Sequence, residues 1–127
     1  MTHEDKELLL RDLCARLPYK VIVEFVSYEC EEKPWFGELS CKSLDYFIHD
    51  VGIIEIKPYL FPLSSMTEEQ KKEFDQLLEL ELKAINDEID PMQATIFEVD
   101  FYNKHHLDWR GLIPKGLAID ATGKNIY

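Results

Sequence analysis

The sequence has no excess of basic residues. Its 127 residues include 14 Lys and Arg against 25 Asp and Glu, so the formal net charge is −11 at pH 7. Proteins that bind DNA, RNA or anionic membranes rely on Lys and Arg side chains that face phosphates. The composition therefore argues against nucleic-acid binding and against binding to an anionic membrane surface. We favour the interpretation that this charge keeps the protein soluble, with attraction to a basic partner as the alternative.

Cysteine pairs and long apolar runs are also missing. The three cysteines, Cys14, Cys30 and Cys41, form no Cys-x-x-Cys pair and no zinc-ligand spacing. Free thiols are typical of cytosolic proteins, and a Cys30–Cys41 disulfide stays open as an alternative. No stretch approaches the roughly 18 apolar residues of a membrane helix. The start MTHEDKELLL has acids and only one Lys before a run of three leucines, whereas a signal peptide has a basic start and a longer apolar run. We expect a cytoplasmic protein.

Familiar catalytic motifs are absent as well. The chain contains no G-x-S-x-G, P-loop, G-x-G-x-x-G or H-E-x-x-H motif. We therefore expect no resident metal or cofactor, and the sequence favours a non-enzymatic protein.

What the chain does have is the pattern of one α+β domain. Leucines recur at helical spacing behind acidic residues, which predicts a helix from Glu4 to Arg16. β-Branched and aromatic runs predict short strands, at 19–26, 35–44 (continued or followed by another at 45–49) and 53–56 before Pro58. We expect a three- to four-stranded antiparallel meander, or alternatively a small SH3-like barrel. Two C-terminal helices and a short edge strand at 117–119 would complete the fold.

The two C-terminal helices have strong start signals. A capping box over 67–70 predicts a helix that continues to about Glu88. Asp90–Pro91 combines a good N-cap with a good first helical residue, which predicts a further helix to about His106. The segment 95–102 also alternates as a strand would, and we favour the helix.

The densest cluster of chemically active residue types is FYNKHHLDWRGLIPKGLAID, residues 101–120. His105, His106 and Asp108 are all metal-ligand types. Adjacent residues of a helix point about 100° apart, so the two histidines do not easily share one metal. We favour a structural role, in which one histidine caps a helix C-terminus and the other packs inside.

Trp109 and Arg110 form a second candidate site. Asp108 and Arg110 would fix a turn by a charge-assisted bond, with Gly111 in a left-handed conformation. Trp and Arg also dominate interface energies, which makes this corner a candidate for partner binding. The structural interpretation, with Trp109 in the core, is favoured because large aromatic side chains are mostly buried.

Glu81 is the third candidate. Helical periodicity places it between Leu77 and Ile85, inside the apolar arc of its helix. A carboxylate there needs a partner, such as Arg110, Lys115 or one of the two histidines. A structural salt bridge is favoured over acid–base chemistry.

Three motifs resemble a known family. LLLRDLCARLPYKVIVE, IKPYLFPLSSMTEEQKKEF and NKHHLDWRGLIPKGLAID are similar to segments of small uncharacterised proteins from phages, prophages and mobile elements of Bacteroides-type gut bacteria. Relatives read nearer to HHFDYRGLI, so Leu107 and Trp109 replace aromatics here, and residues 80–99 match least. The resemblance implies a phage-related protein and assigns no catalytic residue, cofactor or substrate.

Together these patterns predict an interaction protein that docks a protein partner through Trp109, Arg110 and Asp108 or through its acidic faces. A version of this prediction is an acidic inhibitor of a basic partner, for which Glu29, Glu31 and Glu32 and the acids of 68–79 are the runs to inspect. The alternative is a small metal-dependent or acid–base hydrolase that uses His105 or His106 with Asp108 and Glu81. The sequence leaves the oligomeric state open.

Overall fold

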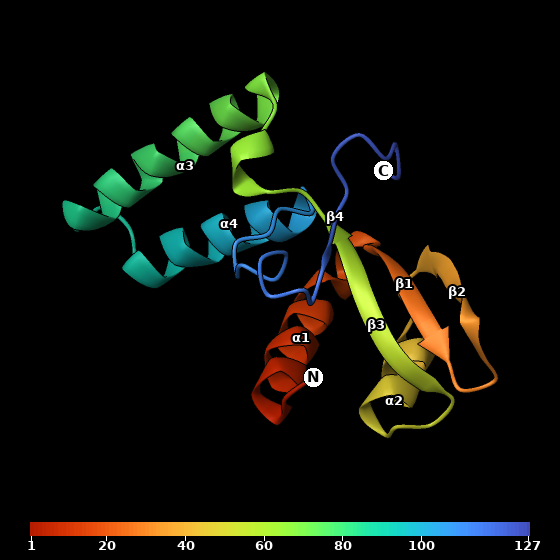
Figure 1. Ribbon diagram of the computed structural model, residues 1–127. Coiled ribbons are helices and arrows are strands. Elements are labelled where there is room, and N and C mark those ends of the chain that lie inside the picture. Colours follow the sequence, from red (N-terminus) through yellow and green to blue (C-terminus); the bar gives the residue numbers. More distant parts are fainter.

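The protein is an α+β domain in a computed structural model (Figure 1), as predicted. The structure describes the backbone of all 127 residues and the side chains of 1–29 and 33–127. The predictions that involve Cys30, Glu31 and Glu32 therefore lie outside the described side chains.

Helix α1, His3–Arg16, confirms the first predicted helix. The Thr2 side chain accepts a hydrogen bond from the Asp5 backbone N–H at 3.0 Å and caps the N-terminus. Leu9 and Leu13 are fully buried on the face that packs against the sheet.

The four-stranded sheet has the order β2-β1-β3-β4. Strands β1 (Ile22–Ser27) and β2 (Cys30–Glu38) form an antiparallel hairpin, and β3 (Ile53–Leu60) pairs antiparallel with the other side of β1. The short strand β4, Ile119–Asp120, is parallel to β3. The predicted meander is wrong in connectivity, because β1 lies between β2 and β3. The sheet is also open, with β2 and β4 at its edges, and does not curl into a barrel.

Helix α2, Cys41–Ile48, replaces the strand that was predicted over the end of 35–44 and over 45–49. Ser40 and Ser43 form a reciprocal capping box that starts this helix. Leu44 and Phe47, spaced three apart, are then buried on one side. A local cap and helical spacing thus outweigh the β-propensity of Tyr46, Phe47 and Ile48.

Strand β3 runs through Pro58, which was predicted to end it. Pro58 pairs with Val23 of β1, whereas β4 reaches only Tyr59 and Leu60. At Pro58 one side of β3 therefore has no strand partner in the described pairing, and a residue without an N–H is tolerated beside such an edge.

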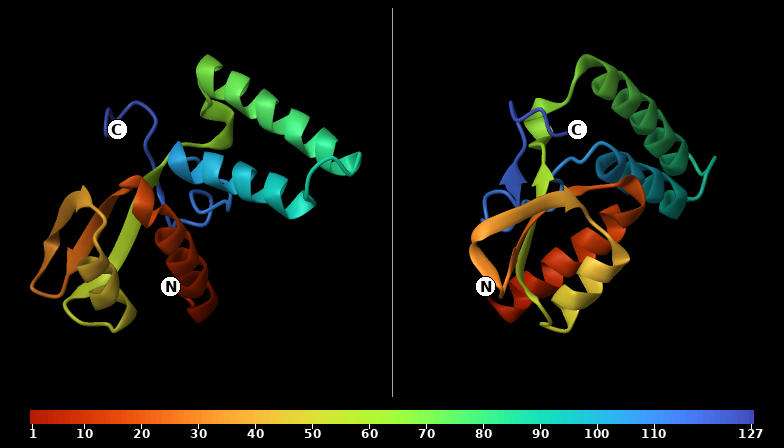
Figure 2. Two further views of the ribbon diagram at one scale, coloured as in Figure 1. Left: turned by 180° about the vertical axis from the view of Figure 1, so that it is seen from behind. Right: turned by 90° about the vertical axis from the view of Figure 1, so that its right-hand side faces the viewer.

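Helices α3 (Glu68–Ile85) and α4 (Pro91–Lys104) form an antiparallel hairpin. The Thr67–Gln70 capping box and the Asp90 cap are present as predicted, and 95–102 is helical. Both helices end earlier than expected, close to Asp87 and His106, which adopt left-handed conformations with φ near 60°. The hairpin projects away from the sheet in both views (Figure 2).

One hydrophobic core lies between the sheet and α1 and α2. It includes Leu9 and Leu13 of α1, Leu44 and Phe47 of α2, and Ile56 of β3. Lys6 of α1 lies 5.0 Å from the Phe47 ring centroid, so the two helices are neighbours on the same face. The α3–α4 hairpin contributes none of the described members of this core.

Candidate functional site

The C-terminal corner begins where α4 ends. His106, with its positive φ, turns the chain back toward the end of β3. The Phe61 N–H donates to the His106 carbonyl at 2.8 Å, and the Asp108 N–H donates to the Phe61 carbonyl at 2.8 Å. Backbone bonds therefore attach this corner to the sheet.

The two histidines point to different neighbours. His105 Nε2 lies 2.9 Å from Glu73 Oε2 of α3, and its ring contacts Phe101. The His106 ring stacks on Tyr127 with centroids 3.8 Å apart. Burial, followed by the nearby Arg16 charge, lowers the pKa of His106 to about 4. His106 is therefore neutral at pH 7, and the histidines do not converge on one point.

Asp108 is used by the backbone. Its carboxylate is 7% exposed and accepts hydrogen bonds from the N–H groups of Leu112 and Ile113 at 2.8 and 2.9 Å. Over the side chains of 1–29 and 33–127, no three His, Cys, Asp or Glu residues are placed to hold a metal ion. Asp108 therefore orders a turn. The residues named for a hydrolase do not converge on one point.

Trp109 and Arg110 also make their contacts inside the protein. Trp109 Nε1 donates to Asn103 Oδ1 at 3.0 Å, and its ring stacks on Tyr102. The Arg110 guanidinium lies 4.2 Å from the Trp109 ring, and its Nε is 3.4 Å from Asp12 Oδ1. The expected Asp108–Arg110 bond is replaced by an ion pair with Asp12.

Asp12 and Arg16 form a buried ion pair that the sequence analysis missed. Both side chains are fully buried, and Arg16 Nε donates to Asp12 Oδ2 at 2.8 Å. Arg16 Nη2 donates to the Leu107 carbonyl at 2.6 Å, which ties α1 to the C-terminal corner. Burial raises the pKa of Asp12 above its ordinary value, although Arg16 and Arg110 oppose the shift. The available signal was the i, i+4 Asp–Arg pair beside Leu9 and Leu13.

Glu81 faces α4 and pairs with Glu98 instead of a cation. The side-chain hydrogen bond to Glu98 raises the pKa of Glu81, and burial and the negative charge of Glu98 act in the same direction. The Tyr102 hydroxyl donates to Glu98 Oε1 at 2.8 Å. Glu81 and the histidine corner therefore belong to different parts of the molecule.

Six large apolar side chains of the hairpin are exposed to solvent. On α3, Leu78, Leu82 and Ile85 follow one stripe at i, i+4 and i+7 and are 40%, 60% and 76% exposed. On α4, Met92 and Ile96 are 65% and 46% exposed, and Phe97 is 40% exposed. These six residues, which are exposed on several sides of the two helices, are together called the apolar hairpin surface.

A hollow of about 330 Å³ lies between the two helices near the hairpin tip. It is lined by Glu81, Ala84 and Ile85 of α3 and by Pro91, Ala94 and Thr95 of α4. Ala84 and Ala94 are buried at its base because small side chains let the helices approach and leave space above them. The hollow thus joins the α3 stripe to α4.

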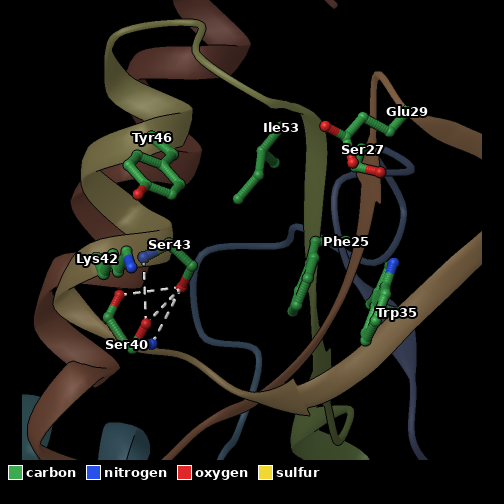
Figure 3. Close-up of a pocket in the computed structure, with 9 residues that line it drawn as sticks. All are labelled: Phe25, Ser27, Glu29, Trp35, Ser40, Lys42, Ser43, Tyr46 and Ile53. Atoms are coloured by element: carbon green, nitrogen blue, oxygen red, sulfur yellow. Dashed lines mark hydrogen bonds between the residues drawn. The ribbon is translucent and has the colours of Figure 1, made fainter.

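A second hollow, of about 610 Å³, lies between α2 and the sheet. Figure 3 shows Phe25 and Trp35 on the sheet side and Tyr46 and Lys42 on the α2 side, with the Ser40–Ser43 capping bonds at one end. It is a rival binding surface, with aromatic walls and charges of both signs, Lys42 and Glu29, among its lining residues.

Comparison with known proteins adds no family. No family model matches the chain, and no curated protein or solved structure matches it significantly. Among the described helices, none combines the length and the apolarity needed to cross a membrane.

Proposed function

We propose that the protein is a non-enzymatic interaction module of phage or mobile-element origin, which acts in the bacterial cytoplasm and docks a protein partner on its α3–α4 hairpin. The observation that carries this proposal is the apolar hairpin surface. Leu82, Ile85 and Met92 are each at least 60% exposed, on helices that project from the body. Apolar patches of this kind mark protein-interaction sites in soluble proteins.

The hairpin is a better docking candidate than the Trp109–Arg110 corner. Trp109 hydrogen-bonds Asn103 and stacks on Tyr102, and Arg110 pairs with Asp12, so both side chains already have partners within the chain. Binding a partner there would first break these contacts. At the hairpin tip, by contrast, a partner would cover side chains that contact water.

Affinity capture tests this proposal with paired variants. The wild-type chain, immobilised in a lysate of the organism that encodes it, should retain a defined partner that Leu82→Asp and Ile85→Asp lose. Ile48→Asp is the matched control, because Ile48 is an exposed apolar residue of α2, far from the hairpin. Equal capture by all four proteins would contradict the proposal.

The hydrolase alternative makes a separate prediction, because a metal that binds only the folded state must raise its melting temperature. We expect Zn²⁺, Mn²⁺ and Mg²⁺ to leave the melting temperature of the protein unchanged, since His105, His106 and Asp108 point to different partners. Differential scanning fluorimetry measures this directly. A metal-dependent rise that His105→Asn and His106→Asn abolish would revive the enzyme interpretation.

A further inference from the structure

The charge around the apolar hairpin surface is strongly one-sided. Residues 75–100 carry eight acidic side chains and a single lysine, Lys83, so this segment holds a net charge of −7 of the −11 on the whole chain. Asp75 and Glu79 flank the α3 stripe, and Asp100 lies one turn after Ile96. A partner that covers the apolar residues must therefore bring the edge of its own binding surface close to these acidic side chains.

The shape of the surface suits a helix. The exposed residues of α3 are spaced at i, i+4 and i+7, and the hollow at Ala84 and Ala94 lies beside them. A third helix laid along the hairpin would place its own apolar side chains against Leu78, Leu82 and Ile85 and one side chain into the hollow. Amphipathic helices bind apolar grooves in this way through anchors at the same spacing.

The Glu81–Glu98 pair adds a specific feature. Glu81 lines the hollow, and its carboxyl group bonds to that of Glu98, which also accepts the Tyr102 hydroxyl. Two adjacent carboxyl groups are better satisfied by one guanidinium than by each other, because a guanidinium donates several hydrogen bonds and neutralises their charge.

A second copy of the chain is a poor occupant by the same argument. Packing two hairpins face to face would bring together two segments that each carry a net charge of −7. Like charges opposed across an interface select against a partner.

We infer that the partner presents a basic amphipathic helix, which packs along the apolar hairpin surface and directs an arginine or lysine to the Glu81–Glu98 pair. This inference rests on the proposed function, because it names the occupant of the same surface.

A synthetic amphipathic peptide tests the inference without knowledge of the natural partner. The probe is a helical peptide with leucine on one face and arginine on the other, labelled for fluorescence anisotropy. Two companions are a scrambled peptide of the same composition and a peptide with glutamate in place of arginine. We expect the full-length protein to bind the basic amphipathic peptide at least about tenfold more tightly than either companion.

Protein variants locate the binding site. Leu82→Asp, and separately the Glu81→Gln/Glu98→Gln pair, should each weaken binding of the basic peptide by about tenfold or more. Ile48→Asp, Trp35→Glu and the Glu4→Gln/Glu7→Gln pair should leave it within about twofold, since they change the α2 surface, the aromatic hollow and the acids of α1 respectively. The Glu4/Glu7 pair controls for the loss of two negative charges at a remote site.

Three results would overturn the inference. The scrambled peptide would bind as tightly as the ordered one, the control variants would lose as much affinity as the hairpin variants, or sedimentation velocity would show a dimer that Leu82→Asp dissociates. If capture from lysate still depends on Leu82 and Ile85 while the basic peptide does not bind, the proposed function stands and only this identification of the partner fails.

Discussion

Two buried charges, Asp12 and Arg16, connect the first helix to the C-terminal corner. Arg16 bonds both to Asp12 and to the Leu107 carbonyl, 91 residues further along the chain. Arg110 approaches the same carboxylate from the corner itself. These contacts attach the His105–Arg110 segment, and with it the end of α4, to α1.

Replacing Arg16 with Met should destabilise the protein by about 3–5 kcal/mol, because it leaves Asp12 buried without its principal partner. Chemical denaturation at neutral pH measures the change in the free energy of unfolding. Arg11→Met is the matched control, since Arg11 lies on the same helix and is exposed. The Asp12→Leu/Arg16→Met pair should recover much of the loss, and a single variant as stable as wild type would contradict the structural role.

His106 makes stability depend on pH. Its pKa is about 4 in the folded protein and 6.5 in an ordinary context, so the unfolded chain binds more protons between these values. The stability that neutral His106 contributes is therefore fully present above about pH 6.5, and this contribution is lost as pH falls toward 4. His106→Asn, which tolerates the positive φ, should flatten the melting temperature between these pH values. His105→Asn serves as the control, and an unchanged slope in His106→Asn would contradict this assignment.

At the scale of elements, local signals predicted the helices that carry them. The caps at Thr67 and Asp90 and the leucine spacing of α1 place three helices within a few residues of their observed bounds. The sheet order was not predictable in the same way, because β3 pairs with β1 and not with β2, the strand before it, and this pairing joins distant residues such as Val23 and Pro58. Helix α2 was missed although Ser40 and Ser43 form its cap, since the aromatic residues after them also favour strands.

The contrast between local signals and distant contacts also applies to the candidate site. Periodicity placed Glu81 between Leu77 and Ile85 and predicted a cationic partner, but its partner is Glu98, which lies on another helix and could not be read from spacing. Periodicity shows that Leu78, Leu82 and Ile85 share the apolar side of the helix, but it does not show what covers them. Only the structure shows that no element of the described fold covers these three residues at the hairpin tip.

The hairpin should also unfold more readily than the body. Thr67→Ala removes the cap of α3 and should cost about 1 kcal/mol. Because the hairpin adds none of the described members of the main core, the loss should appear as faster amide exchange in α3 and α4, with α1 and β1 unaffected. Gln76→Ala is the control, because alanine is a good helix former at an exposed position. Uniformly faster exchange across the whole protein would contradict a separable hairpin.

At the scale of the whole molecule, the protein divides into a two-layer body and a projecting acidic hairpin (Figure 2). The body contains the main hydrophobic core, while the hairpin adds none of its described members, exposes six large apolar side chains and holds most of the net negative charge. This division is consistent with a scaffold that presents one surface to a partner. A complex formed there should weaken as salt rises, since screening reduces attraction between opposite charges.

Methionine oxidation in the presence of the captured partner reports whether the partner covers the hairpin. Met92 lies on the apolar hairpin surface and is 65% exposed, and Met1, away from the hairpin, is 63% exposed, so the free protein carries a matched internal reference. Oxidation followed by peptide mass spectrometry reports the accessibility of both side chains. Docking on the hairpin predicts that the partner slows oxidation of Met92 and leaves Met1 unchanged. Equal oxidation of Met92 with and without the partner would contradict the account.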